Sequence, residues 1–205
     1  MIHRPTAIAR LGVFGGAFDP PHVAHRAVLQ AAVAQLRLDA VHGVPTGQAW
    51  HKTRQLSSAA DRIAMAELAF GDLPGVRVDT RETARDGPSF SIDTVRELQR
   101  EYPQAALFLI VGQDQAQSLT LWREWQALVH SATICVAARQ GTGSEDGRFA
   151  LPPEVQRALI TLQIQASPVS ATDIRRRVSS GQSVVPLVGA AVARYIVHHH
   201  LYQTA

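Results

Sequence analysis

The sequence of 205 residues contains a single cysteine, Cys135, which lies in the apolar run 132–138. One cysteine cannot form a disulfide within the chain, so a disulfide-stabilised secreted fold is excluded and a reducing cytoplasm is the expected compartment. A buried thiol is the favoured interpretation of this residue. No apolar run approaches the roughly 18 residues that a membrane-spanning helix needs, and no signal peptide is recognisable before the first apolar segment. The sequence therefore predicts no membrane partner.

Strong charge of one sign is also missing. Charged residues make up 18% of the chain, and the formal net charge is +3 with nine histidines counted as neutral. This mild surplus suits anionic substrates, but no dense run of lysine or arginine indicates a nucleic-acid partner. The chain also lacks the P-loop pattern G-x-x-x-x-G-K-[ST] and the G-x-S-x-G elbow, which excludes P-loop enzymes and serine hydrolases of the elbow type.

What the sequence does contain is an alternation of apolar runs and helical patterns. This alternation predicts an α/β class protein with one doubly wound parallel sheet, formed by residues 1–205 as a single domain with a C-terminal helical part at 168–205. The expected strands cover 7–14, 40–44, 76–78, 105–112, 132–138 and 161–166. The expected helices cover 23–36, 59–70, 91–101, 121–129, 154–159, a stretch within 168–181, and 186–200.

The first motif, GVFGGAFDPPHVAH, occupies residues 12–25. Gly15 and Gly16 supply a backbone without Cβ atoms that can turn sharply and approach a ligand closely. The prolines that follow prepare the start of a helix, whose free N–H groups and dipole favour an anion such as phosphate. His22 and His25 are three residues apart and therefore share one face of the first turn. The stretch predicts a polyphosphate site at a strand–helix junction.

Residues 15–25 resemble the signature G-G-x-F-D-P-x-H-x-G-H of the nucleotidyltransferases related to class I aminoacyl-tRNA synthetases, in which this motif binds ATP. Only Ala24 departs from the pattern, at its usual glycine. The resemblance implies a Rossmann-like nucleotidyltransferase fold with magnesium as the ion that accompanies ATP. It also implies ATP contacts from Gly15, Gly16, Ala17, Phe18, Asp19, His22 and His25. A zinc site at the two histidines is the weaker alternative, because no further ligand stands nearby.

A second motif, VSATDIRRR, occupies residues 169–177. Ser170 and Thr172 can cap a helix, and Arg175 lies three residues after Thr172, on the same first turn. Hydroxyl groups, free N–H groups and a guanidinium would converge there, and a guanidinium can hold phosphate oxygens in a bidentate way. An arginine-rich helix facing solvent is the alternative. The stretch is similar to the family's second signature, I-S-S-T-x-I-R, which favours phosphate binding.

Further segments resemble one branch of that family, the nicotinate mononucleotide adenylyltransferases: PSFSIDTVREL at 88–98, IVGQDQAQSLTLWREW at 110–125, and Arg139 after a strand. The resemblance implies that Asp114 contacts a ribose or a neighbouring polar group and that Trp122 stacks on the pyridine ring. It implies that the region of Phe90 and Ser91 receives the nicotinate carboxylate. The alternative for Trp122 is a half-buried helix residue.

His51 and Lys52 resemble the family's phosphate-binding loop, although residues 46–50 depart from its usual asparagine and paired prolines. The expected reaction is adenylyl transfer from ATP to nicotinate mononucleotide, with His22 nearest the transferred group. His25, Arg175 and Lys52 would hold the phosphates. The alternatives are phosphopantetheine adenylyltransferase and a nucleotide-binding regulator without chemistry. The residues alone leave open the oligomeric state and the preference for acid or amide, because none is an unambiguous receptor for a carboxylate.

Overall fold

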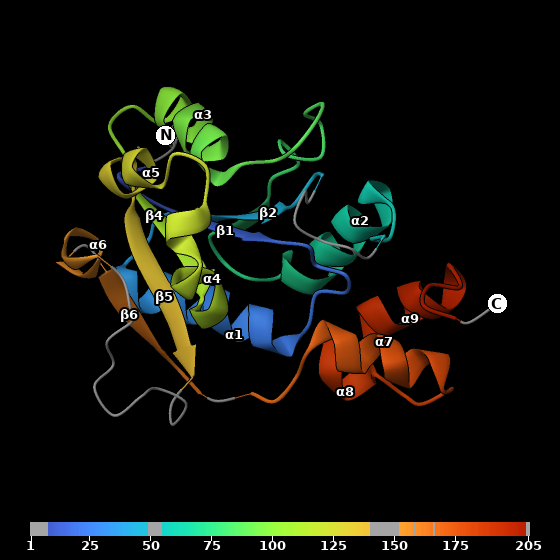
Figure 1. Cartoon of the computed structure of the whole chain (residues 1–205). Coiled ribbons are helices and arrows are strands. Elements are labelled where there is room, and N and C mark those ends of the chain that lie inside the picture. Colours follow the sequence, from blue (N-terminus) through green and yellow to red (C-terminus); the bar gives the residue numbers. More distant parts are fainter. Residues whose placement is uncertain (1–7, 49–54, 140–151, 158, 166, 204–205) are drawn as a thin grey trace, which may run out of the picture.

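A computed structural model describes residues 8–48, 55–139, 152–157, 159–165 and 167–203. Six strands of this part form one sheet in the order β3-β2-β1-β4-β5-β6, and all neighbouring pairs are parallel (Figure 1). The strands are β1 Arg10–Gly16, β2 Ala40–Pro45, β3 Val76–Val78, β4 Ala106–Gly112, β5 Thr133–Arg139 and β6 Leu159–Ile164. The predicted α/β class and parallel sheet are confirmed, with β6 at an edge as its sequence indicates.

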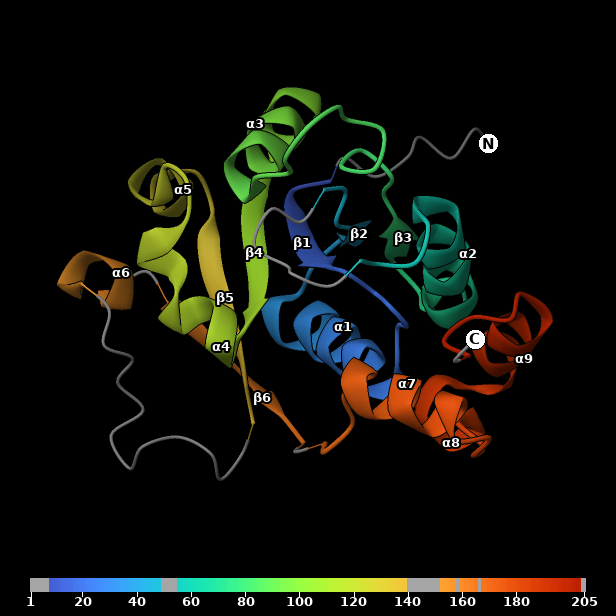
Figure 2. The same cartoon turned by 45° about the vertical axis from the view of Figure 1, so that its right-hand side comes forward.

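Helices cover both faces of the sheet (Figures 1 and 2). The helices are α1 Val23–Leu36, α2 Ala59–Phe70, α3 Ser91–Glu101, α4 Gln113–Gln117, η1 Leu119–Leu121, α5 Trp125–Ser131, α6 Pro153–Arg157, α7 Ala171–Ser179, α8 Val185–Val188 and α9 Ala190–His198. The bounds of α1, α2 and α3 are those that the sequence predicts. Two of the predicted caps are present, because the hydroxyls of Ser58 and Ser170 accept the N–H groups of Asp61 and Asp173.

Two hydrophobic cores separate the sheet from its two helical layers. One core joins the sheet to α1, α2, α7, α8 and α9, and the other joins it to α3, α4, α5 and α6. Neighbouring side chains on one strand serve opposite cores, so Val13 faces the α3 layer while Phe14 faces the α1 layer. This alternation follows from the pleat of a strand, and it explains why both faces of β1 are apolar.

The strand order places a change of direction between β1 and β4. The chain proceeds from β1 to β2 and β3 on one side, and then continues with β4, β5 and β6 on the other side. In open parallel sheets, ligands bind beyond the carboxyl ends of the strands at this change of direction. The fold therefore directs attention to the residues that follow β1 and β4.

Three local predictions are wrong. The helix expected over 121–129 is interrupted after η1, because Trp122 is extended and Glu124 takes a left-handed conformation with φ 49° before α5 begins. The closing helix expected over 186–200 divides into α8 and α9 at Gly189, whose φ is +83°. The sharp turn expected at Gly15 and Gly16 lies instead at Phe18, which adopts a φ of 47° while both glycines remain in β1.

Candidate functional site

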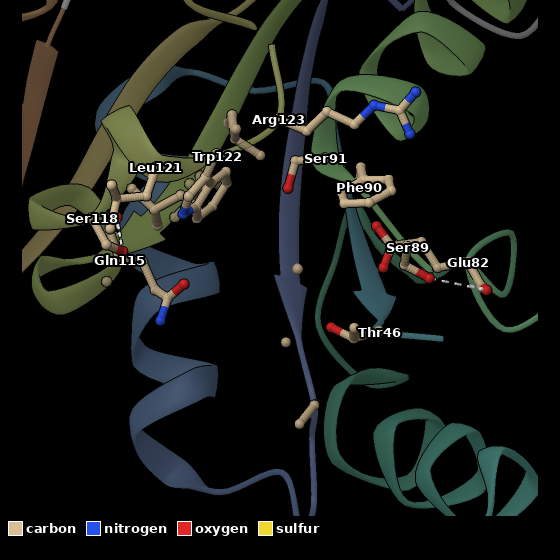
Figure 3. A pocket seen from close by; sticks show the side chains of 17 residues that line it. Thr46, Glu82, Ser89, Phe90, Ser91, Gln115, Ser118, Leu121, Trp122 and Arg123 are labelled. Carbon is tan, nitrogen blue, oxygen red and sulfur yellow. Dashed lines mark hydrogen bonds between the residues drawn. The ribbon is translucent and has the colours of Figure 1, made fainter. Parts of the chain in front are cut away.

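A cavity of about 390 Å³ opens at the carboxyl ends of β1 and β4 (Figure 3). Backbone from both strands forms its floor, and side chains from the loops after β2, β3 and β4 form its walls. The lining residues are Gly15, Gly16, Ala17, Thr46, Glu82, Ser89, Phe90, Ser91, Leu109, Ile110, Val111, Gly112, Gln115, Ser118, Leu121, Trp122 and Arg123. The cavity lies where the strand order predicts a ligand.

The two glycines of the first motif serve different purposes. A Cβ atom at Gly16 would lie 2.8 Å from the ring of Phe18, so this position cannot carry a side chain without moving a fully buried aromatic residue. A Cβ atom at Gly15 would meet nothing within 4 Å, because the residue faces the open cavity. Gly16 is thus required by packing, and Gly15 leaves room for a ligand to approach the backbone.

The two histidines of the motif stand together at the start of α1. His22 is the N-cap residue and is buried, and its ring stacks on that of His25 with 3.7 Å between centroids. The backbone N–H of His22 donates to Nδ1 of His25 at 3.2 Å. An Nδ1 that accepts carries no proton, so a neutral His25 ring has its proton on Nε2. The predicted shared face is confirmed, although neither histidine lines the cavity.

Asp19 connects this turn to distant parts of the chain. Its buried carboxylate accepts the hydroxyl of Tyr202 at 2.6 Å and the N–H of Ser57 at 3.3 Å. Its carbonyl oxygen accepts Nη1 of Arg175 at 2.8 Å. The pKa of Tyr202 is raised, first by burial and then by the adjacent carboxylate. The carboxylate of Asp19 therefore has a structural role in joining the motif to the C-terminal segment.

Arg175 reaches the first motif from α7, across 156 positions of sequence. Its second terminal nitrogen donates to the hydroxyl of Thr172 at 3.1 Å, so the guanidinium is oriented from two sides. Ser170 is the N-cap of the helix. The structure thus brings the second motif to the residue that precedes the prolines of the first. Neighbouring Arg176 is exposed and pairs with Asp173 on its own helix instead.

One buried residue of this region was missed by sequence reasoning. Arg62 lies in the first turn of α2 with 3% of its surface exposed. Its guanidinium donates to the carbonyl oxygens of Ser57, Ala17 and Thr46, at 3.0, 3.1 and 2.7 Å. It therefore fastens the loop after β1 to the loop after β2. Burial lowers its pKa. An arginine within an amphipathic helix reads as a surface residue, and no signal in the sequence marks it as buried.

The second part of the predicted site lies on the opposite side of the cavity. Phe90 and Ser91, at the start of α3, face Trp122 from the segment between η1 and α5, and all three line the cavity (Figure 3). Asp114 lies at the carboxyl end of β4 within α4, but it is exposed and does not line the cavity. Gln115 and Ser118 of the same connection line it instead.

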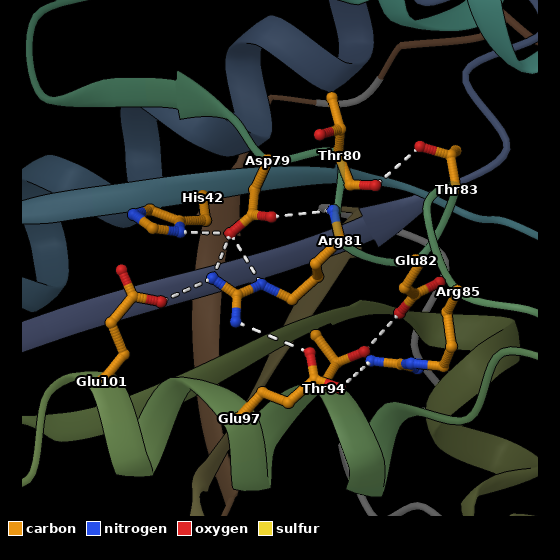
Figure 4. A network of polar contacts seen from close by, with 10 residues as sticks. All are labelled: His42, Asp79, Thr80, Arg81, Glu82, Thr83, Arg85, Thr94, Glu97 and Glu101. Carbon is orange, nitrogen blue, oxygen red and sulfur yellow. Dashed lines mark hydrogen bonds and ion pairs between the residues drawn. The ribbon is translucent and has the colours of Figure 1, made fainter.

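A network of polar side chains supports the wall that Phe90 and Ser91 form (Figure 4). The carboxylate of Glu82 is buried and accepts the hydroxyl of Thr94 in α3 at 2.8 Å. Burial raises the pKa of Glu82, and this hydrogen bond partly opposes the effect. A Cβ atom at Gly47 would lie 2.0 Å from the carbonyl oxygen of Glu82, so only glycine fits there.

The remainder of this network centres on Asp79, directly after β3. Its carboxylate accepts Nδ1 of His42 and Nε of Arg81, both at 2.8 Å, and Arg81 also pairs with Glu101 at the end of α3 (Figure 4). Burial opposes ionisation of Asp79, but the hydrogen bonds from His42 and Arg81 outweigh it, so the pKa of this carboxyl lies well below its usual range. The network thus ties the ends of β2 and β3 to α3.

Some of the predicted site residues lie outside the part of the chain that the structure describes. Lys52, with His51, lies in 49–54, and the side chain of Arg139 at the end of β5 is not described. Within the described residues, no group of three or more His, Cys, Asp or Glu side chains could hold a metal ion. In the same part of the chain, no helix is long and apolar enough to cross a membrane. The thiol of Cys135 is buried as expected, and this burial raises its pKa to about 12.

This strand order, with a glycine-lined cavity at the carboxyl ends of β1 and β4, is typical of nucleotide-binding proteins of the α/β class. The family model described as cytidylyltransferase-like matches residues 13–177, which include all but the first residue of the first motif and the whole of the second. The chain belongs to the cytidylyltransferase-like family and, within it, to the nicotinate-nucleotide adenylyltransferases. It is therefore a nucleotidyltransferase, as the sequence predicts.

Curated relatives match over almost the whole chain. A probable nicotinate-nucleotide adenylyltransferase of Albidiferax ferrireducens is 54% identical over 96% of this chain and 99% of its own length. One from Neisseria meningitidis serogroup B is 37% identical over 95% and 98%. The solved nicotinic acid mononucleotide adenylyltransferase of Plasmodium falciparum, complexed with NaAD, has a TM-score of 0.76 and covers 95% of this chain and 97% of its own. At 15% identity it shows the shared fold alone.

Proposed function

We propose that the protein transfers the adenylyl group of ATP to the phosphate of nicotinate mononucleotide, forming nicotinate adenine dinucleotide and releasing pyrophosphate. The observation that carries this proposal is one continuous cavity that begins at the glycines of the ATP motif and ends between Phe90 and Trp122. A chamber of this shape suits two substrates that must meet. The 54% identity to a nicotinate-nucleotide adenylyltransferase supports this choice of the second substrate.

In the proposed reaction the attacking group is already an anionic phosphate, so no general base is needed. Catalysis then rests on in-line positioning and on neutralising charge at the α-phosphorus and at the departing pyrophosphate. His22 would contact the transferred group, and His25 the phosphates beside it. Both stand at the N-terminus of α1, where N–H groups and the helix dipole also favour an anion.

Arg175 and Lys52 would hold the β- and γ-phosphates. Arg175 is suited to this role because Asp19 and Thr172 already orient its guanidinium at the motif. The hydroxyls of Ser170 and Thr172 would add donors beside it. The backbone from Gly15 to Asp19 would contact the rest of the nucleotide, and Gly15 leaves space for that approach.

The second substrate would occupy the other end of the cavity. The pyridine ring would stack on Trp122, and Phe90 and Ser91 would surround its carboxylate. Asp114 would contact the ribose from the rim, since its exposed position places it outside the cavity itself. Arg139 remains a proposed substrate contact on the resemblance alone.

A divalent metal generally accompanies ATP in this family, and we propose magnesium for this chain. Magnesium commonly binds through substrate phosphates with few protein ligands, which agrees with a site that has no cluster of three or more candidate ligands among the described residues. The ion would add positive charge beside the phosphates. The proposal treats 1–205 as one domain, supported by the core that α7, α8 and α9 share with α1 and α2. The single cysteine favours the cytoplasm.

The decisive experiment measures pyrophosphate release from ATP and magnesium with nicotinate mononucleotide, its amide counterpart or phosphopantetheine offered in turn. We expect rapid release with nicotinate mononucleotide and formation of the dinucleotide, identified by mass. Pyrophosphate release only in the mixture that contains phosphopantetheine would assign the protein to that reaction instead. Binding of ATP without release in any of the three mixtures would contradict the enzyme proposal and favour a regulator.

A further inference from the structure

The charged side chains of the cavity lie at its mononucleotide end. Of the described residues that line the cavity, two have ionisable side chains, Glu82 and Arg123. The carboxylate of Glu82 is buried and accepts hydrogen bonds from Thr94 and from the backbone N–H of Gly47. Arg123 is different, because 55% of its side chain is exposed and it follows directly on Trp122. Among the described lining residues, Arg123 is thus the cation that an anionic ligand can reach.

The guanidinium of Arg123 stands over the ring of Phe90, with Cζ 4.7 Å from the ring centroid. Trp122 and Phe90 line the cavity from two segments, and the Arg123 side chain bridges these segments (Figure 3). A flat aromatic ring that enters between Trp122 and Phe90 would therefore meet the positive charge of Arg123 beside Phe90. Phe90 also holds the guanidinium in place through a cation–π contact.

The acidic neighbour of Arg123 is engaged elsewhere. Glu124 accepts two hydrogen bonds from Arg96 of α3, at 3.2 and 2.6 Å, whereas its contact with Nε of Arg123 is 3.8 Å long. The bidentate pair with Arg96 holds the segment after η1 against α3. Because Arg96 compensates most of the charge on Glu124, the Arg123 guanidinium keeps its capacity to bind another anion.

We propose that Arg123 determines specificity by binding the carboxylate of the aromatic acid and so favours a pyridine carboxylate over the corresponding carboxamide. This inference rests on the proposed function and assigns to one side chain the acid selectivity that the sequence leaves open. The guanidinium offers planar paired donors that match a carboxylate, and an uncharged amide gains much less from a cation. The alternative is that Arg123 only fastens Trp122 to Phe90.

The test compares kcat/KM for nicotinate mononucleotide and nicotinamide mononucleotide in the unmodified enzyme and in three variants. Arg123→Gln removes the charge, and Arg123→Lys retains it without the planar fork. Arg100→Gln is the matched control, because it removes one arginine of α3 whose side chain is exposed and outside the cavity. We expect Arg123→Gln to lower kcat/KM for the acid roughly tenfold, the low end of a charge-assisted hydrogen bond at an exposed site.

For the amide we expect Arg123→Gln to change kcat/KM by less than about twofold, so the acid-to-amide ratio falls roughly tenfold. Arg123→Lys should keep part of the ratio, and Arg100→Gln all of it. An equal fall in kcat/KM for both substrates would show that Arg123 only holds the Trp122 segment against Phe90. An unchanged ratio and unchanged rates would show that the side chain does not contact the ligand, and either result overturns the inference.

A binding measurement separates this inference from the proposed function. Quenching of tryptophan fluorescence by each mononucleotide reports occupancy without requiring turnover. If the unmodified protein formed no dinucleotide, the proposed function would fail, yet a loss of acid binding in Arg123→Gln would still support the assignment of Arg123. If the unmodified protein formed the dinucleotide normally, and the unmodified protein and Arg123→Gln bound the acid equally well, only the assignment of Arg123 would be wrong.

Discussion

The two parts of the candidate site are built in different ways. At the proposed ATP end, His22, His25 and Arg175 belong to two compact motifs beside the cavity lining, and Arg175 and Tyr202 both donate hydrogen bonds to Asp19. At the α3 end, the wall depends on single polar residues of the loop after β3. Glu82 accepts the hydroxyl of Thr94 in α3, and Asp79 binds Arg81, which pairs with Glu101 of the same helix. Charge neutralisation during the reaction needs closely fixed donors, which short motifs supply. The polar residues that support the α3 wall belong to no such motif.

The largest expected effect is at the ATP end. His22→Ala should lower kcat by about 100- to 1,000-fold, because a preorganised donor aimed at developing charge contributes that much to a transition state. Melting temperature should change little, since the helix keeps its other contacts. His130→Ala is the control, because His130 is exposed on α5, outside the two motifs, and its ring bonds to the carbonyl of Gln126 on its own helix. Normal turnover in His22→Ala would remove this histidine from the mechanism.

Arg175→Ala should follow, with kcat/KM for ATP reduced on the order of 10- to 100-fold through the loss of charge-assisted hydrogen bonds to phosphate. Arg175→Lys should recover only part of this loss, since an ammonium cannot contact Asp19, Thr172 and a phosphate in the same planar geometry. Arg176→Ala removes the next arginine of the same helix and is expected to leave kcat/KM for ATP unchanged. Equal effects in the two alanine variants would indicate a general charge effect.

The difference between the two ends also determines how much the sequence alone could predict. The alternation of apolar runs fixes the fold class, and the helix caps at Ser58 and Ser170 fix two helix starts, because these are local consequences of backbone chemistry. The stacked pair His22 and His25 is equally local. Arg175 could be predicted because its motif is recognisable, although its contact with Asp19 is a product of the tertiary fold.

The rest depends on contacts between residues far apart. Arg62 and Glu82 lie in segments where charged residues are ordinary on a surface, and only the folded chain buries them. The helix expected over 121–129 is interrupted at Trp122 and Glu124, and Glu124 pairs with Arg96 of α3, a contact between segments that no periodicity within 121–129 can encode. Asp114 lies at the end of a strand as the sequence indicates, but only the folded chain shows that it is exposed beside the cavity and that its neighbour Gln115 lines it.

At the α3 end the expected effect is on stability and its dependence on pH. The folded state depresses the pKa of Asp79 below the value of about 3.9 that this group has in the unfolded chain. The ionised carboxylate therefore stabilises the fold at pH values above that unfolded pKa, and this contribution is lost as pH falls from there toward the lower pKa of the folded state. Asp79→Asn should lower the free energy of unfolding at pH 7 by about 2 kcal/mol and flatten its fall between about pH 5 and pH 2.

Urea unfolding across this pH range measures both effects. Asp72→Asn serves as the comparison, because Asp72 also pairs with an arginine but its side chain is 68% exposed, so its loss should be much smaller. The same acid-induced loss of stability in Asp79→Asn as in the unmodified protein would mean that other carboxylates dominate. In Asp79→Asn we expect activity to fall together with stability only if the substitution loosens the wall formed by Phe90 and Ser91.

The smallest expected effect lies where the ATP end meets the C-terminal segment. Tyr202→Phe removes the hydroxyl that donates to Asp19 at 2.6 Å, and the carboxylate is buried, so the free energy of unfolding should fall by about 1–2 kcal/mol. Tyr195→Phe removes a similar bond to Asp61 at 3.0 Å, where Asp61 is less buried, and should cost at most about 0.5 kcal/mol. Because Arg175 binds the carbonyl oxygen of Asp19, a contact that does not involve the Tyr202 hydroxyl, kcat in Tyr202→Phe should stay within about threefold of the unmodified value. The contrary outcome is a loss of kcat as large as that in Arg175→Ala without a matching loss of stability. It would mean that the Asp19 carboxylate acts in the reaction and does more than hold the first motif in position.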